Sequence, residues 1–99
     1  MTRLTADEIV QAVGGLSGWE QSGDAIVRTV RCPSFMDGIR LVNRVAAMAE
    51  AADHHPDIDI RYRDIRFLLV THAEGGLTEK DVNLARQISE AVGQGPSVS

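Results

Sequence analysis

Hydrophobic and polar residues follow two spacings along this chain, one typical of helices and one typical of strands. Apolar residues recur every three or four positions in segments 6–13, 35–52 and 79–92, which indicates three amphipathic helices. Between these segments the apolar residues occupy alternate positions, as they do in strands with one buried face. The pattern predicts the order helix, hairpin, helix, hairpin, helix.

The ends of the predicted helices carry capping and stop signals. A hydroxyl residue followed three positions later by an acidic residue can cap the free N–H groups of a helix start. Such hydroxyl residues precede all three helices: Thr5, Ser34 and Thr78. Gly14 and Gly93 end the first and the last helix. Pro56 disfavours helical geometry just before it, so the main helix is expected to run to about Ala52.

Two of the helices are expected to bury an apolar stripe against a sheet. In the main helix the stripe consists of Phe35, Ile39, Val42, Val45, Ala46 and Ala49. In the last helix it consists of Val82, Ala85, Ile88 and Val92. Polar residues fill the opposite side of each helix, so one side is expected to face water.

Four strands are expected from the two hairpins. The first hairpin joins 16–21 to 25–32 through a turn centred on glycine. The second joins 57–62 to 65–72 through a tight turn at 63–64. The last strand is apolar on both faces near its end, so we expect it to be central in the sheet. Its outer face would then be covered by a partner subunit.

Antiparallel hairpins separated by helices are typical of an α+β two-layer sandwich. The predicted fold is a four-stranded antiparallel sheet with the helices packed on one face. A chain of 99 residues has the size of one domain, and we expect residues 1–93 to form a single domain. Residues 94–99 are rich in Gly, Pro and Ser and are expected to form a flexible C-terminal tail.

Composition narrows the functional classes. The net charge of -4 argues against a protein that binds nucleic acid by neutralising phosphates. A single cysteine, Cys32, excludes an intrachain disulfide and a multi-cysteine zinc site, and it fits a reducing compartment. No apolar run is long enough to span a membrane, and no secretory signal peptide is found. We therefore expect a cytoplasmic protein that binds neither nucleic acid nor a membrane.

The candidate chemistry lies in three histidines, His54, His55 and His72. Imidazole is the side chain that titrates nearest to neutral pH, so a converging cluster of histidines suits proton transfer. A solvated surface pair and a zinc site are the alternatives. Zinc is disfavoured because adjacent histidines on a helix point about 100° apart, and a nearby aspartate would have to complete the site.

Other chemistries lack their motifs in this sequence. Cys32 has no activating neighbour, which argues against a cysteine nucleophile. Gly75-Gly76 has neither the spacing of a phosphate-binding loop nor that of a dinucleotide fingerprint. What remains is acid/base catalysis without a cofactor, such as hydration, dehydration or isomerisation.

A set of residues spread over most of the chain matches one enzyme family. The set comprises Glu50-x-x-Asp53-His54-His55-Pro56-Asp57, Tyr62, Thr71-His72 and Gly76-Leu77-Thr78-x-x-Asp81. With this spacing the chain, from about Trp19 to Val92, resembles the pterin-4a-carbinolamine dehydratases. The resemblance implies that 4a-hydroxytetrahydropterin is dehydrated to quinonoid dihydropterin and water in tetrahydrobiopterin recycling, with no metal and no organic cofactor.

The same resemblance implies roles for single residues. His55 would hold the pterin near its 4a-hydroxyl, and His54 and His72 would form the acid/base pair. Three further residues are implied to bind the substrate: Asp53, which would orient the cluster, Asp81 and Trp19. Ile58 departs from the family, since many members carry an aromatic residue at this position, and we expect the pocket wall to differ there.

A binding role is the alternative from another class of function. Some members of the resembling family act as dimerisation partners of a transcription factor, and here the helix 35–52 would serve that role. The three histidines favour the enzyme, because a binding module does not need them. The same chemistry on a non-pterin substrate, or a scaffold that helps another enzyme assemble, is a third interpretation. The resemblance also implies a homodimer or homotetramer.

Overall fold

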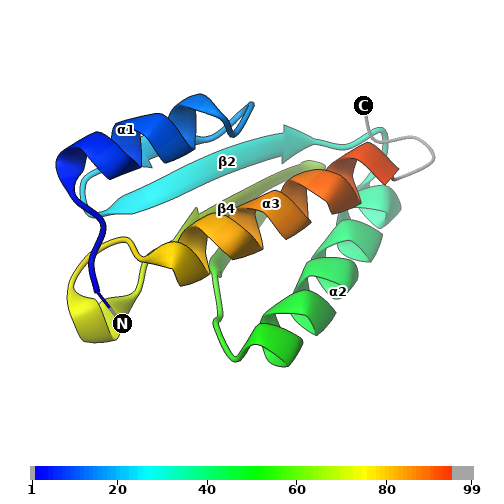
Figure 1. The fold of residues 1–99 in the computed structure, drawn as a ribbon. Coiled ribbons are helices and arrows are strands. Elements are labelled where there is room, and N and C mark those ends of the chain that lie inside the picture. The colour runs from blue at the N-terminus through cyan, green and yellow to red at the C-terminus, as the bar shows by residue number, and fades with distance from the viewer. Residues whose placement is uncertain (1, 95–99) are drawn as a thin grey trace.

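A computed structural model of the protein describes residues 2–94 and places three helices against a four-stranded sheet (Figure 1). Along the chain the elements are α1 (Ala6–Gly14), β1 (Glu20–Ser22), β2 (Ala25–Arg31), α2 (Phe35–Ala52), β3 (Asp57–Arg61), β4 (Asp64–Leu69), the 3-10 helix η1 (His72–Glu74) and α3 (Glu79–Gln94). Of the predicted tail, Gln94 is the last residue of α3, and residues 95–99 lie outside the described residues. None of the helices in residues 2–94 is long and apolar enough to cross a membrane.

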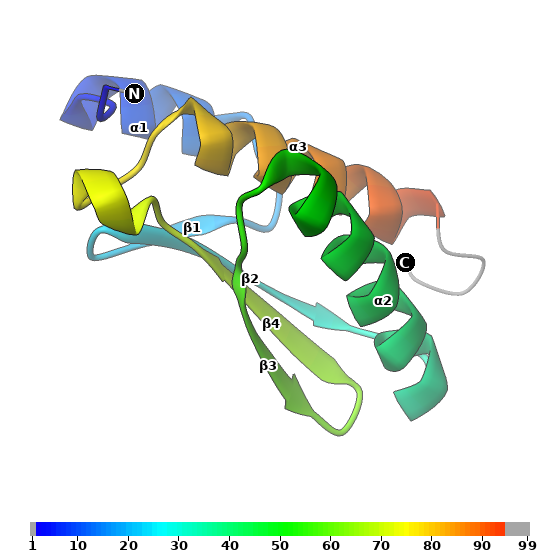
Figure 2. The same ribbon diagram turned by 90° about the horizontal axis from the view of Figure 1, so that it is seen from below.

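Each strand runs antiparallel to its neighbours, in the order β1-β2-β4-β3. β2 and β4 form the centre of the sheet, and they pair from Ile26 and Leu69 to Arg31 and Asp64. Figure 2 shows the three helices on one side of this sheet. The predicted α+β two-layer fold is confirmed, and so is the central place of the last strand.

The core lies between the helices and the sheet face that they cover. Alternate residues of β4, which are Ile65, Phe67 and Leu69, are fully buried there. The helices supply the other half of the core through Leu41, Val45, Ala49, Val82, Leu84, Ala85 and Ile88. Burial of one large aliphatic or aromatic side chain stabilises the fold by about 1.5–3 kcal/mol, so this contact holds the two layers together.

α2 begins and ends where predicted, and Val45 and Ala49 of the expected stripe are buried, but the buried face is rotated from the predicted one. Phe35 and Ala46, which were expected in the buried stripe, are exposed, whereas Gly38 and Leu41 are buried. Gly38 explains the rotation, because a Cβ at this position would lie 3.0 Å from Cδ1 of Ile65. The missing side chain lets the helix approach β4 along this face. A pattern of apolar residues does not reveal such a contact.

Three strand ends differ from the prediction. β1 is shorter than expected because the chain turns through 16–19 before the strand begins. β3 and β4 pair right up to a two-residue loop, so Tyr62 lies in the turn with a φ of 53° and is exposed, instead of ending the predicted strand 57–62. β4 ends at Leu69, and His72 therefore starts η1 instead of ending a strand.

The opposite face of the sheet has no helix over it in the described part of the chain. Val27, Leu68 and Val70 are half-buried on that face. Charged residues surround them, among them Arg66 and Asp59, whose side chains lie 3.6 Å apart. The expected cover by a partner subunit stays a prediction.

Candidate active site

The end of α2 turns the chain toward α3 at His54. Asp53 closes the helix in a left-handed conformation, with φ 50° and ψ 44°. The N–H of His54 then bonds back to the C=O of Ala49 at 3.1 Å, which is common after a left-handed residue at a helix end. Aspartate adopts this conformation more readily than most residues. The left-handed residue thus sets the direction in which the chain leaves α2 at His54, while the expected role of Asp53 in orienting the histidines and binding substrate stays a prediction.

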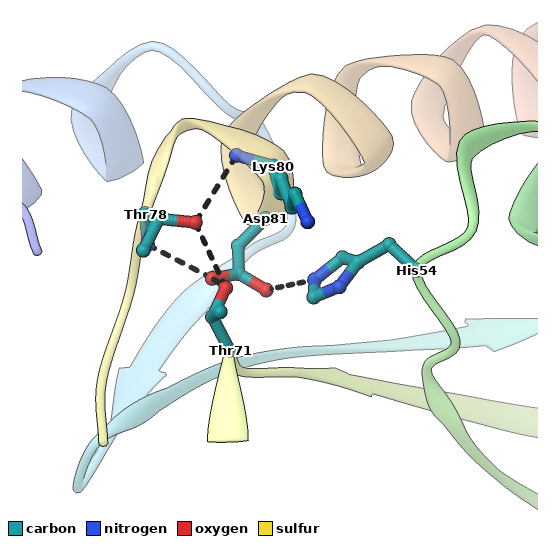
Figure 3. Close-up of polar contacts among 5 residues, drawn as sticks. All are labelled: His54, Thr71, Thr78, Lys80 and Asp81. Atoms are coloured by element: carbon teal, nitrogen blue, oxygen red, sulfur yellow. Dashed lines mark hydrogen bonds and ion pairs between the residues drawn. The ribbon is translucent and has the colours of Figure 1, made fainter. Parts of the chain in front are cut away.

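His54 contacts Asp81 in the first turn of α3 (Figure 3). Its Nε2 lies 2.6 Å from Oδ1, the imidazole is 11% exposed and the carboxylate is fully buried. An ionised carboxylate only accepts hydrogen bonds, so Nε2 must carry a proton. Nδ1 is then the free base of the neutral ring, or the free acid of the imidazolium. The pair fixes which nitrogen can exchange a proton.

Two threonines complete the surroundings of the Asp81 carboxylate. Its Oδ2 accepts from the Thr71 hydroxyl at 2.8 Å and from the Thr78 backbone N–H at 2.9 Å. Because Thr71 donates its only proton to Asp81, it accepts from the Thr78 hydroxyl across their 2.8 Å contact. The Thr78 hydroxyl accepts in turn from the backbone N–H of Lys80 at 3.3 Å. Together with His54, these donors replace water around the buried carboxylate.

His55 and His72 are exposed, and each is next in sequence to a residue of this network. The His55 side chain is 56% exposed, and its Nε2 lies 3.5 Å from Oε1 of the exposed Glu50. His72 is exposed at the start of η1. Each follows a member of the network directly in sequence, His55 after His54 and His72 after Thr71. The network thus holds one part-buried imidazole, and two exposed imidazoles follow its members in sequence.

Trp19 is placed apart from the histidines. It is buried in the core, and its Nε1 donates to Oγ of Ser89 at 3.0 Å. Ser89 lies eight residues after Asp81 on α3, which is about 12 Å along the helix axis. A contact between Trp19 and a substrate at the histidines stays a prediction, and the geometry adds no support to it.

The hydroxyl part of the network is the part that sequence reasoning missed. The sequence indicates Thr78 only as a helix cap, and it gives no role to Thr71. A usable signal exists, because a Thr-x-x-Asp cap brings the aspartate to the backbone N–H of the threonine. Thr71 also continues the alternation of buried residues in β4, which predicts that its hydroxyl is buried and needs a partner.

A metal would find few free ligands here. His54 already uses Nε2 for Asp81, and His55 faces Glu50 at the surface. In residues 2–94, no group of three or more His, Cys, Asp or Glu side chains has an arrangement that could hold a metal ion.

The sequence is similar to one family over nearly its whole length. The sequence model of the family described as pterin 4 alpha carbinolamine dehydratase matches residues 2–91. A protein of Mycobacterium sp. (strain KMS) is 56% identical over 90 residues, which cover 91% of this chain and 96% of the relative. A protein of Nocardia farcinica (strain IFM 10152) is 56% identical over 90 residues, covering 90% and 95%. Both are named "Putative pterin-4-alpha-carbinolamine dehydratase".

Solved structures agree in fold. The crystal structure of a transcriptional coactivator/pterin dehydratase from Brucella melitensis has a TM-score of 0.88 and 33% identity, and covers 91% of this chain and 98% of that one. A pterin dehydratase-like protein identified as a RuBisCO assembly factor in the alpha-carboxysome has a TM-score of 0.64, with coverages of 76% and 87%. At 16% identity this second likeness shows the fold alone. By fold and by sequence, the chain belongs to the pterin 4 alpha carbinolamine dehydratase family.

Proposed function

We propose that this protein is a cytoplasmic dehydratase that converts 4a-hydroxytetrahydropterin to quinonoid dihydropterin and water in tetrahydrobiopterin recycling. The observation that carries the proposal is the pair of His54 and Asp81, 2.6 Å apart, and the exposed His55 and His72 follow His54 and Thr71 of the same network in sequence. Membership in the family supplies the substrate class and the type of reaction. No metal or organic cofactor takes part in the proposed reaction.

The reaction needs one proton delivered and one proton removed. The C4a–O bond breaks as the hydroxyl takes up a proton and leaves as water. The pterin ring loses a proton from nitrogen, and the electron pair of that N–H bond forms the new double bond to carbon. The acid and the base then exchange protons with water and return to their starting states. Each well-placed acid or base accelerates such a step by about 10²- to 10⁴-fold.

We assign His54 and His72 as the acid/base pair and His55 as the residue that holds the pterin near its 4a-hydroxyl. Because Nε2 of His54 faces Asp81, Nδ1 is the nitrogen left for proton exchange. His55 and His72 are exposed, so a substrate can reach both imidazoles. Asp81 acts through His54 as a positioning residue that fixes the tautomer.

A stopped-flow assay of 4a-carbinolamine dehydration tests this proposal, with purified protein in chelator-treated buffer. We expect a rate above the spontaneous one that does not depend on the chelator. His72→Ala should bring the rate close to the spontaneous one. Arg40→Gln is the control, because Arg40 is exposed and lies about 21 Å along α2 from His54. A folded wild-type protein that does not accelerate dehydration would contradict the proposal.

A binding role through α2 is the second candidate. Phe35 and Met36 at the start of this helix are 45% and 52% exposed. Ile39 and Val42 continue the same side, one and two turns further on, and are half-buried. An exposed apolar strip of this kind is typical of a surface that binds protein. A second copy of this chain, in a homodimer or homotetramer, or another protein would cover it.

Light scattering on wild type and Phe35→Asp tests the α2 surface. We expect a homodimer or homotetramer that Phe35→Asp dissociates, because a buried, unpaired carboxylate destabilises an interface. Arg40→Gln, on the same helix but already in water, should leave the assembly unchanged. A wild type that is monomeric at high concentration would contradict self-association and leave this surface for another protein.

A further inference from the structure

Arg28 is a cation on the core side of the sheet. On β2 it is paired with Phe67 of β4, whose side chain is fully buried, and it is itself half-buried under the helices. In residues 2–94 its one hydrogen bond runs from Nη1 to Oγ of Ser89 at 3.0 Å, and no carboxylate pairs with it. Buried charges are normally paired, and burial lowers the pKa of this guanidinium. Arg28 thus lacks a counterion.

Ser89 presents a hydroxyl proton beside Arg28. Its Oγ accepts from Nη1 of Arg28 and from Nε1 of Trp19, both at 3.0 Å. These two bonds occupy both lone pairs of the hydroxyl oxygen, so its proton remains to be donated. Within the described residues nothing accepts that proton. Arg28 and Ser89 therefore present neighbouring hydrogen-bond donors, and within the described residues no further acceptor pairs with them.

Both donors line a cavity of about 520 Å³ between the turn after α1, β2 and the second half of α3. Ser17 and Arg86 add polar groups to its wall, and Leu16 and Val92 add an apolar part. The volume falls in the range of sites for small molecules. The cavity combines a cluster of donors with an apolar wall, as a site for an amphiphilic small molecule requires.

The charges around the cavity favour a ligand with one negative charge. The lining includes two cationic side chains, those of Arg28 and Arg86, and one carboxylate, that of the exposed Glu90. It therefore carries two positive charges and one negative charge. Glu90 repels a phosphate dianion more strongly than a singly charged carboxylate, and a carboxylate can accept two parallel hydrogen bonds from the planar guanidinium. Gly18 leaves room for this guanidinium, because a Cβ there would lie 2.9 Å from Nε of Arg28.

We propose that this cavity is a second binding site, which takes a small carboxylic acid with an apolar body. The carboxylate accepts from Arg28 and Ser89, and the apolar body lies against Leu16 and Val92. Ser89 lies about 12 Å along α3 from Asp81, so the site is separate from the histidines. Its occupation does not depend on the dehydration proposed above.

Trp19 provides a direct readout of this site. It is the only tryptophan in the chain, and its indole N–H bonds to Ser89, so one indole resonance in the NMR spectrum reports on the cavity. Hexanoate is titrated into isotope-labelled protein, with hexanamide as the neutral probe of the same shape. We expect hexanoate to shift the resonance saturably and hexanamide to bind at least about tenfold more weakly, because the charged hydrogen bonds are lost. Equal affinities, no saturable shift, or tighter binding of inorganic phosphate would overturn the proposal.

Variants separate the cavity from the histidines. Arg28→Gln and Ser89→Ala should each weaken hexanoate binding by about tenfold or more. Glu90→Gln should strengthen it roughly two- to fivefold, because it removes the competing carboxylate. His55→Ala should bind hexanoate as tightly as wild type. Unchanged affinity in a folded Arg28→Gln would overturn the proposal, and if that variant does not fold, the two probes on wild type decide the question.

Discussion

The Nε2 atom of His54 lies 2.6 Å from the Oδ1 atom of Asp81, although 27 positions separate the two residues in sequence. His54 is presented by the left-handed end of α2, and Asp81 by the first turn of α3. The same carboxylate also accepts from the N–H of Thr78 and so caps α3. One aspartate therefore serves both a helix start and the orientation of an imidazole.

Asp81→Asn should lower the dehydration rate by about 100-fold or more, because a neutral amide no longer fixes the protonated Nε2 of His54. It should also lower the free energy of unfolding by about 1–3 kcal/mol, since the network loses a charged acceptor. Stopped-flow kinetics and urea unfolding measure the two effects. Glu79→Gln is the matched control, because it removes an exposed acid from the same helical turn. A normal rate in folded Asp81→Asn would contradict the positioning role.

Replacing each of the three histidines by alanine should affect the free energy of unfolding differently. His55→Ala and His72→Ala should lose most activity but change the free energy of unfolding by no more than about 0.5 kcal/mol, because both side chains are exposed. His54→Ala should lose activity and also about 1–3 kcal/mol, because it leaves Asp81 short of a donor. Circular dichroism and thermal melts, run beside the rate assay, make the comparison. Unfolding of His55→Ala or His72→Ala would instead indicate a structural role for that histidine.

Gly18→Ala should destabilise the protein by about 1–3 kcal/mol. Gly18 has a φ of +87°, and an added Cβ would lie 2.9 Å from Nε of Arg28. Gly14→Ala is the matched control, because the same methyl group meets nothing within 4 Å there, and it should be neutral or stabilise by up to about 1 kcal/mol. Urea unfolding of both variants gives the difference. Equal stabilities would show that Arg28 is not confined by Gly18.

Cys32 should be unreactive in the folded protein. Burial first, and then the nearby carboxylates of Asp37 and Asp64, raise the pKa of its thiol. The folded state therefore holds this proton more tightly than the unfolded chain, so stability should fall as the pH rises above about 8.5. Thiol titration with a disulfide reagent should be slow in native protein and fast in denaturant. Cys32→Ala should remove this part of the pH dependence, and rapid labelling of the native thiol would contradict the expectation.

The pattern of apolar residues predicts an element of this fold well where residues close in sequence determine its ends. Both ends of α2 follow from the cap at Ser34 and the proline at position 56. The buried face of α2 follows only in part: Val45 and Ala49 are buried as expected, but its rotation toward Gly38 depends on the contact of Gly38 with Ile65. Tyr62 has a side chain that suits a strand, yet the pairing of β3 with β4 places it in the loop. A contact between segments far apart in sequence decided the first difference, and the register of one hairpin decided the second.

The site is only partly predictable for the same reason. Sequence identifies the three histidines, but no spacing reveals that Asp81 meets His54, and only resemblance to the family pointed to that aspartate. The alternation in β4 predicts that the Thr71 hydroxyl needs a partner, but no local signal identifies that partner as Asp81. Arg28 gives a weak sequence signal for the second site, because it interrupts a row of apolar residues on the covered face of β2.

Because Asp81 both caps α3 and contacts His54, an aspartate at this position in a related protein is weak evidence that the relative is an enzyme. A descendant that had abandoned turnover would still keep a carboxylate at this place, because the start of α3 depends on it. Both His55 and His72 are exposed in the described part of the chain, so their loss should cost little stability, and mutation would replace them first once selection for turnover ended. With the roles proposed above, the two surface histidines, and not the aspartate, should therefore distinguish relatives that still catalyse the reaction.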